Sequence, residues 1–292
     1  MARPLPALED RAQLGILLTL AAWGFFSFVD TGAKWVAVAG LPAVQIAFFR
    51  YVGHLVLASA FLFRERPDQI WPDEAPAVFI RAALLAAATL SNFWILSVLP
   101  LTITSAIMFS SPVIVCFLSV SLLKEKVGPW RWGAILLGFI GVLVVLQPFG
   151  TAFHPMMLMA VFNACCLAAY SLITRAIAGK VSTDMMQFWM GVVGTVPLLP
   201  LAILSWHPPA SGLDWAILLA LGPIAWAGHQ LLTNALRYAS ANTLMPFTYS
   251  FLLYLTVLGW LVFNHVPEAA TLLGASIIMA SGLIIWWREG AR

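Results

Sequence analysis

Charge is what this 292-residue sequence has least of: only 9% of its residues are Asp, Glu, Lys or Arg. An ordinary soluble domain carries about 25% charged residues and about 45–50% apolar ones, whereas 62% of this chain is hydrophobic. The composition therefore excludes a soluble globule, a disordered chain and a coiled coil. A membrane-spanning helix needs roughly 20 apolar residues. Ten such helices would use about 200 residues, so no room remains for a soluble catalytic or nucleotide-binding domain.

Cysteine is also scarce, with three residues in the whole chain: Cys116, Cys165 and Cys166. Three cysteines are too few for a disulfide scaffold, and all three lie in apolar runs. We expect them to be small, buried and reduced side chains.

Motifs that carry catalysis are missing as well: the chain has no HExxH and no GxSxG. The DTG tripeptide that begins at Asp30 matches the one in aspartic proteases, but their chemistry needs two carboxylates that share a proton. Asp30 is the only carboxylate well inside an apolar run. Lys180 follows a glycine but precedes Val181, so it does not belong to a nucleotide-binding P-loop. We expect no enzyme activity, no catalytic residue, no metal site and no cofactor.

Ten apolar runs are long enough to span a membrane. They cover residues 13–37, 42–63, 76–98, 101–123, 129–147, 155–178, 184–205, 213–235, 239–263 and 266–288. Backbone amides in lipid must be satisfied within their own segment, so these runs must be helices. Barrel strands are excluded because they alternate over about 10 residues. We therefore expect an all-α integral membrane protein with ten transmembrane helices.

Lysine and arginine in short loops mark the cytoplasmic side of a membrane protein. Apart from Lys34 and Arg50, which lie within spans, all cations fall on one side. They are Arg3, Arg11, Arg64, Arg66, Arg81, Lys124, Lys126, Arg131, Arg175, Lys180, Arg237, Arg288 and Arg292. Both termini are therefore expected in the cytoplasm. The excess of basic residues indicates topology, and no nucleic-acid partner is expected.

The chain also contains an internal repeat. The fifth and tenth runs read alike from Gly133 and from Gly274, an offset of 141 residues, and Gly53 matches Gly194 at the same offset. The two copies cover residues 13–147 and 153–288. An odd number of spans per copy forces the second copy upside down relative to the first, so we expect two inverted five-helix repeats. Inverted repeats are typical of secondary transporters, with the substrate site near the bilayer midplane between the copies.

Two stretches of the first copy resemble the EamA-type branch of the drug/metabolite transporter superfamily: residues 104–113 (TSAIMFSSPV) and 122–128 (LLKEKVG). That family carries a mid-helix proline in the fourth span and a glutamate in the loop after it, which correspond here to Pro112 and Glu125. In the second copy, Leu252 and His265 stand where the proline and glutamate are expected. Overall similarity within the family is to the YddG-type exporters of aromatic and other amino acids.

Polar residues inside spans are the candidate site, because an ion at the bilayer centre costs roughly 2.5–3.5 kcal/mol on insertion scales. In the first span, Trp23, Ser27, Asp30 and Lys34 lie on one helix face. The inverted counterpart in the sixth span carries Asn163 and Tyr170 on a similar face. Two interpretations stay open: a polar lining of the substrate path, or a structural ion pair that joins Asp30 to Lys34 or Arg50.

Other spans add candidates of the same kind. They are Asn92 and Trp94 in the third span, Ser111 in the fourth, His229 in the eighth and Tyr249 in the ninth, with Pro112, Pro223 and Pro246 as kinks that serve as gates. A proline frees one carbonyl a turn earlier, and that carbonyl must find another partner in the membrane. We expect a central cavity lined by the first, third, fourth, sixth, eighth and ninth spans. A hydrogen-bonded packing histidine and fixed proline kinks are the structural alternatives.

The function these observations favour is a secondary-active exporter of aromatic and other neutral amino acids, or of similar small metabolites, that works by alternating access. The expected partners are a small-molecule substrate and the lipid bilayer, with a monomer sufficient, and the expected location is a bacterial inner membrane. Export of another metabolite or drug class, passive exchange and a passive channel are the alternatives. Channels usually show a signature filter or rings from several subunits, and the sequence shows neither.

Overall fold

The computed structural model describes residues 11–65, 70–72, 74–111, 114, 118, 129–147, 153–177, 180–239 and 244–290. The described elements are helices. They are α1 (Ala12–Val38), α2 (Ala43–Glu65), α3 (Ala75–Leu96), α4 (Leu101–Met108), α6 (Pro129–Leu146), α7 (Met156–Ile177), α8 (Thr183–Leu204), α9 (Gly212–Tyr238), the 3-10 helix η1 (Met245–Tyr249), α11 (Ser250–Phe263) and α12 (Ala269–Gly290). The expected all-α architecture is confirmed.

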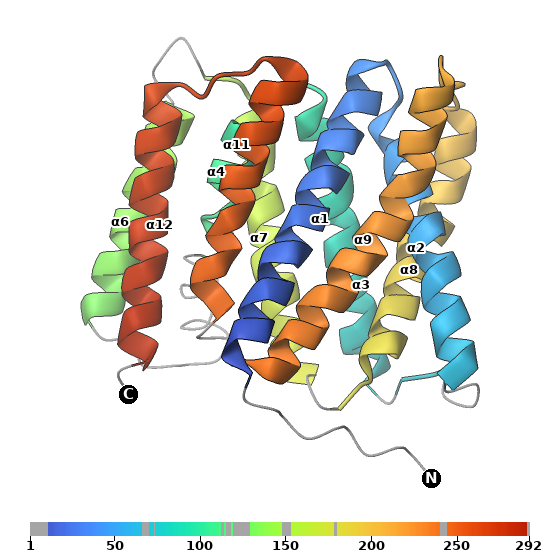
Figure 1. Cartoon of the computed structure of the whole chain (residues 1–292), viewed down its shortest axis with the longest axis horizontal. Coiled ribbons are helices and arrows are strands. Elements are labelled where there is room, and N and C mark those ends of the chain that lie inside the picture. The colour runs from blue at the N-terminus through green and yellow to red at the C-terminus, as the bar shows by residue number, and fades with distance from the viewer. Residues whose placement is uncertain are drawn as a thin grey trace.

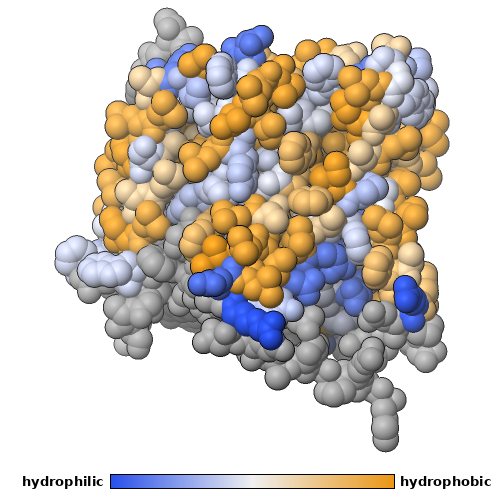
Figure 2. All heavy atoms as spheres, viewed as in Figure 1, coloured by the Kyte–Doolittle hydropathy of each residue, from blue (hydrophilic) through white to orange (hydrophobic). Residues whose placement is uncertain are grey.

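Length and composition make these helices membrane spans. In the described chain, α1, α2, α3, α7, α8 and α9 are long and apolar enough to cross a bilayer, and α6, η1 with α11, and α12 hold shorter apolar segments. With α4 they account for the ten expected spans; residues 112–113, 115–117 and 119–123 of the expected fourth span lie outside the described residues. Figure 2 shows hydrophobic side chains over most of the visible face, with the strongly hydrophilic ones gathered towards its ends. Such a surface fits lipid better than water.

Local sequence signals explain where helices of the second repeat begin. Ser182 caps α8 by accepting a hydrogen bond from the backbone N–H of Met185. Ser211 and Asp214 form a reciprocal capping box at the start of α9, with Ser211 accepting from the Asp214 N–H and Asp214 accepting from the Ser211 N–H. Caps of this kind satisfy amide groups that have no partner within the helix.

The two repeats interlock, and most helices pack mainly against helices of the other repeat. The main pairs are α1 with α9, α3 with α7, α2 with α8, α2 with α9, α3 with α8, α4 with α11, and α6 with α12. Each pair maps onto itself or onto another of these pairs when the repeats are exchanged, as a pseudo-two-fold arrangement requires. Figure 1 shows α6 and α12 side by side at one edge of the bundle and α1 beside α9 at its centre.

The start of α1 and the end of α12 lie at the same end of the bundle, called here the termini end (Figure 1). The backbone N–H of Arg11 donates to the carbonyl of Tyr238 over 3.1 Å, which ties the start of α1 to the end of α9. An even number of spans returns the chain to the side of the bundle on which it began. The other end of the bundle is called the opposite end.

Glycines set the closest helix crossings. A Cβ placed on Gly141 of α6 would lie 3.0 Å from the carbonyl oxygen of Gly274 in α12. A Cβ on Gly222 of α9 would lie 2.5 Å from the Cα of Gly53 in α2. Gly141 and Gly274 are therefore close-packing sites between α6 and α12.

Candidate functional site

Buried and partly buried polar side chains gather between α1, α2 and α3 of the first repeat and α7, α8 and α9 of the second. We call this group the central polar cluster. Its members are Asp30, Arg50, Tyr51, His54, Arg81, Thr89, Asn92, Asn163, Tyr170, Gln187 and His229. Polar groups on a membrane helix must face protein or water, which explains why they converge on the interior.

Helix α3 is the hub of the cluster, because it bonds to four other helices, α1, α2, α7 and α8. Asn92 Nδ2 donates to Asp30 Oδ1 of α1 over 3.1 Å. Thr89 Oγ1 and Tyr51 Oη of α2 share a hydrogen bond of 2.9 Å. Asn163 Nδ2 of α7 donates to the carbonyl of Ala88 and, over 3.2 Å, to Ser91 Oγ.

Lys34 does not form the ion pair with Asp30 that its spacing suggested. Its ammonium donates to the carbonyls of Leu96 (2.9 Å) and Leu99 (2.8 Å), at the end of α3 and in the turn that follows. It also lies 5.4 Å from the ring centre of Phe263. The last carbonyls of a helix have no partner within it and carry a partial negative charge, so they compete successfully for the cation.

Arg50 is 6% exposed and lies over the ring of Tyr51, with 5.0 Å from Cζ to the ring centre. Within the described part of the chain, no nitrogen of Arg50 comes within 4.0 Å of an Asp30 oxygen, so the two are not in direct contact. Buried Nη1 of Arg50 has no hydrogen-bond partner among the described residues. Arg50 therefore keeps unused donor capacity inside the protein.

Arg81 is a member of the cluster that the sequence assigned only to the cytoplasmic end of its span. It is 5% exposed, and it donates from Nη2 to Tyr170 Oη (2.7 Å) and from Nε to Thr174 Oγ1 (2.7 Å). A longer bond of 3.4 Å reaches the carbonyl of Met186 in α8. Arg81 lies one turn inside α3, and that depth was the only signal that it is buried.

Two histidines from different repeats face each other at the centre. The ring centres of His54 and His229 lie 5.8 Å apart, and the rings are nearly perpendicular. Both ring nitrogens of His54, which is 0% exposed, and Nε2 of His229 have no partner in the described structure. The sequence pointed to His229 but not to His54 as a member of the site, although His54 follows Arg50 by one helical turn.

Aromatic side chains extend the cluster towards α11. Phe26 lies edge-on to His229 with 4.9 Å between ring centres. Trp23 contacts both Phe26 (5.6 Å) and Phe251 of α11 (5.2 Å), and its indole Nε1 is buried without a partner in the described structure. Ser27 is 1% exposed and donates to the carbonyl of Gly24 within its own helix.

Tyr249 lies apart from the histidines but within the aromatic group, 5.1 Å from Phe109 between ring centres. Its buried hydroxyl has no partner among the described residues. The oxygen lies so close to Gly282 that a Cβ there would collide with it. Glycine at 282 is therefore what lets this tyrosine approach α12.

Trp94 does not join the site. It is 52% exposed, and Ile80 of the same helix is 55% exposed. Asn92 lies two residues earlier, which on a helix is about 200° away. The prediction that both residues line one path is therefore wrong for Trp94.

The structure describes two of the three prolines that the sequence predicts as kinks. Pro246 lies at the start of the 3-10 helix η1, where its missing N–H is not needed, and not in the interior of an α-helix. Pro223 lies inside α9, where it packs against Gly53 of α2. Pro112 lies outside the described residues; Ser111, beside it, is partly buried.

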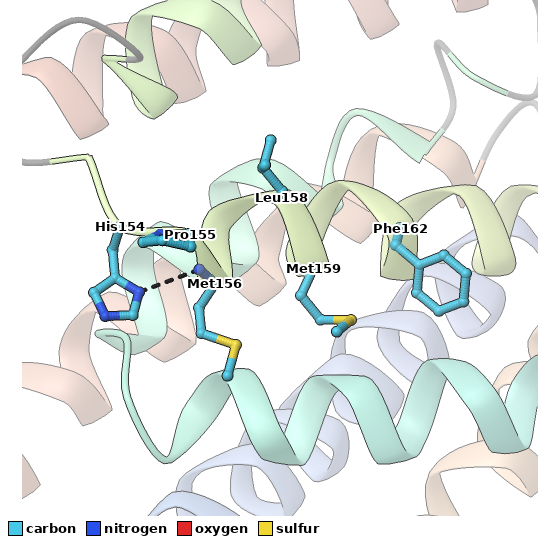
Figure 3. A pocket seen from close by; sticks show the side chains of 6 residues that line it. All are labelled: His154, Pro155, Met156, Leu158, Met159 and Phe162. Atoms are coloured by element: carbon cyan, nitrogen blue, oxygen red, sulfur yellow. Dashed lines mark hydrogen bonds between the residues drawn. The ribbon is translucent and has the colours of Figure 1, made fainter.

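Two open hollows occur on the described surface. The larger, of about 620 Å³, is formed by His154, Pro155, Met156, Leu158, Met159 and Phe162 at the start of α7. Figure 3 shows Met156, Met159 and Phe162 along one side of this helix and the bond between His154 and the Met156 amide. The smaller, of about 260 Å³, lies beside α11 and the segment that follows it. Neither hollow contains a residue of the central polar cluster.

His265 is the titratable group near Lys34 that lies outside the spans. Burial lowers the pKa of His265, and the charge of Lys34 lowers it further. Its ring stacks on Phe263, with 5.9 Å between the ring centres. A neutral imidazole therefore occupies the sequence position that corresponds to Glu125 of the first repeat.

The arrangement suits binding better than catalysis. It combines two buried guanidinium groups, one carboxylate, two imidazoles and several amides and hydroxyls. Among the described residues no group of three or more His, Cys, Asp or Glu is placed to hold a metal ion. Unpaired polar atoms buried in a protein cost about 1–3 kcal/mol each. Their concentration between two repeats therefore needs an explanation, such as a bound water, ion or ligand.

Comparisons with known proteins agree with this architecture. The sequence pattern of the EamA-like transporter family matches residues 13–147 and 154–287. The chain is 28% identical to an S-adenosylmethionine uptake transporter of Rickettsia felis (93% of this chain, 94% of the relative). It is 26% identical to the pseudopaline exporter CntI of Pseudomonas aeruginosa (93% and 95%) and 28% identical to a riboflavin transporter of Vibrio cholerae (94% and 93%). A protein of known crystal structure shares the fold, with a TM-score of 0.64 and 17% identity over 95% of this chain and 96% of that one.

Proposed function

We propose that this chain, which belongs to the EamA-like transporter family, is a secondary-active transporter that carries amino acids or similar small metabolites across a bacterial inner membrane by alternating access. Family membership supports the general class: the chain is a multi-pass membrane transporter of the EamA type and not an enzyme. The substrate, the direction of transport and the coupling to a gradient are the proposed parts.

One observation carries the proposal: a cluster of buried polar side chains with unused hydrogen-bonding atoms lies between the two repeats. Inverted repeats place the substrate at this interface and expose it to each side in turn. We propose the repeat boundaries 13–147 and 153–288, both termini in the cytoplasm, and a site lined by Asp30, Arg50, Asn92, Asn163 and His229.

The relatives broaden the substrate range and correct the narrower resemblance to amino-acid exporters. Those described above are named for S-adenosylmethionine, pseudopaline and riboflavin, and for both uptake and export. S-adenosylmethionine is itself an amino-acid derivative. Carriage of a larger metabolite of that kind is therefore the second candidate function, and free amino acids remain the first.

Counterflow in proteoliposomes tests the proposal. Purified protein is reconstituted, loaded with an unlabelled amino acid and given the radiolabelled one outside, with and without a pH gradient. We expect accumulation of label in loaded vesicles only. Ser27→Trp and Ser111→Trp are expected to reduce the exchange rate by more than about tenfold, because the added indole fills space that the substrate needs.

Ser276→Trp is the matched control, since Ser276 is exposed on α12 and bonds only within its own helix. All three variants are first checked for a single symmetric peak in size-exclusion chromatography. Full exchange by folded Ser27→Trp and Ser111→Trp protein would remove the substrate path from this location.

A further inference from the structure

We propose that Arg50, together with His54 and His229, forms a subsite for a carboxylate group of the substrate. The inference rests on the proposed transport function and names the substrate class: a small organic carboxylate with an aromatic or apolar side chain. It is carried by the charge balance of the cluster, by the unpartnered atoms around Arg50 and by the aromatic groups beside them.

The charge balance of the interior favours an anionic group. Among the described residues in the interior of α1, α2 and α3, three cations are buried: Lys34, Arg50 and Arg81. The carboxylate in the same region is Asp30. A buried charge without compensation is strongly destabilising. Cations therefore outnumber anions here, and a substrate carboxylate would restore the balance.

The three cations are not equally available. Lys34 gives its hydrogen bonds to two carbonyls, and Arg81 gives its bonds to two hydroxyls and one carbonyl. Arg50 differs, because its buried Nη1 makes no bond in the described structure. A guanidinium binds a carboxylate through two parallel N–H groups, so Arg50 is the cation suited to the substrate.

The imidazoles complete this subsite. His54 and His229 both interact electrostatically with Arg50 and lie beside each other. A neutral imidazole carries one N–H donor and one acceptor nitrogen, and three of the four ring nitrogens are buried without a partner in the described structure. Gln187, 4% exposed, has a side-chain amide in the same state. Together they offer N–H donors to the second carboxylate oxygen.

Neighbouring groups fit the rest of such a substrate. Asp30 interacts with Arg50 electrostatically without touching it and is held by Asn92, so it is placed to receive an ammonium group. On the other side, Phe26 contacts His229, and Trp23 and Phe251 follow it. An aromatic or apolar side chain would pack against these rings.

Competition in the counterflow assay tests the carboxylate directly. Wild-type protein exchanges L-phenylalanine in the presence of 3-phenylpropionate, which lacks the ammonium, or of L-phenylalaninamide or phenethylamine, which lack the carboxylate. We expect 3-phenylpropionate to compete with L-phenylalanine. The two compounds without a carboxylate are expected to compete at least about tenfold more weakly, which is the difference expected for a charged hydrogen bond. Equal or better competition by phenethylamine overturns the proposal.

Variants then assign the subsite to Arg50. In Arg50→Gln the preference for 3-phenylpropionate over phenethylamine is expected to disappear, and in Arg50→Lys to shrink. Asp30→Asn is expected to weaken L-phenylalanine and leave 3-phenylpropionate unchanged. Lys180→Gln removes an exposed cation paired with Glu74 and is expected to keep the wild-type preference. If Arg50→Gln does not fold, the wild-type analogue series still decides the question.

Failure of this proposal is distinguishable from failure of the proposed function. Riboflavin, which has no carboxylate, and S-adenosylmethionine are exchanged in the same vesicles. Exchange of riboflavin without any competition by 3-phenylpropionate overturns the carboxylate subsite and leaves a transporter. Absence of exchange for L-phenylalanine, riboflavin and S-adenosylmethionine alike overturns both.

Discussion

The first and second repeats share one architecture but divide the chemistry unequally. Among the described residues, the charged side chains in the interior of the spans, Asp30, Lys34, Arg50 and Arg81, all belong to the first repeat. The second repeat faces them with amides, hydroxyls and one imidazole; its buried Asp214 caps the start of α9 at the opposite end. The two copies thus keep the same packing while one of them carries the charged side chains of the interior.

The contact between α2 and α8 shows why such a division is needed. At the repeat offset of 141, Arg50 of α2 corresponds to Gly191 of α8, and Gly53 corresponds to Gly194. A Cβ on Gly191 would lie 2.9 Å from Leu55, and one on Gly194 would overlap the ring of Tyr51. Two equivalent faces that meet across a pseudo-two-fold axis cannot both carry large side chains. At this contact the first repeat has large side chains such as Tyr51, and the second repeat has glycines that leave room for them.

The largest effect is expected from putting bulk on the second repeat. Gly194→Phe places a ring where Tyr51 already lies, and overpacking in a dense core costs more than about 3 kcal/mol at such a site. We expect loss of the monodisperse peak in size-exclusion chromatography. Adding Tyr51→Ala moves the bulk to the other helix and is expected to recover part of the folded protein.

Gly133→Phe is the matched control for that exchange of bulk, because nothing lies within 4 Å of a Cβ at Gly133. It is expected to behave as wild type. A well-folded Gly194→Phe single variant would contradict the division of space between the repeats.

A smaller effect is expected from removing Arg81, a buried cation of the first repeat that donates hydrogen bonds to the second repeat. Arg81→Met breaks the bonds to Tyr170 and Thr174 and is expected to lower the free energy of unfolding by about 3 kcal/mol. Thermal unfolding in detergent measures the change. Lys180→Met, which removes an exposed ion pair of 3.2 Å, should cost about 0–1 kcal/mol. Equal midpoints for the two variants would show that Arg81 does not join the repeats.

The smallest effect is expected where the repeats are most alike, between α6 and α12. Ser281 Oγ donates to the carbonyl of Ala134 across this pair, and Gly141 approaches Gly274. Ser281→Ala removes one interhelical hydrogen bond, which averages about 0.6 kcal/mol in membrane proteins. We expect an unfolding midpoint within error of wild type and unchanged counterflow. A loss of transport in folded Ser281→Ala protein would show that this pair is more than scaffold.

Hydropathy and charge placement determined the fold class without any tertiary information. The number of spans, their approximate bounds and the inverted repeat follow from apolar runs, from loop cations and from the match between Gly133 and Gly274, because lipid admits only self-satisfied helices. Helical spacing also placed Asp30, Asn163 and His229 on interior faces correctly, since a polar side chain cannot face lipid. These are one-dimensional regularities, and one sequence is enough to read them.

The tertiary structure alone decided which polar groups meet. Lys34 bonds to the end of α3 and not to Asp30, Arg81 enters the interior, His54 meets His229, and Trp94 faces outward. Each outcome depends on helix rotation and on partners far away in the sequence, which are set by the packing of glycines and large side chains across the repeat interface. Periodicity places a residue on a face of its own helix but does not say which helix lies opposite. The packing of the two repeats therefore decides which residues make up the central polar cluster.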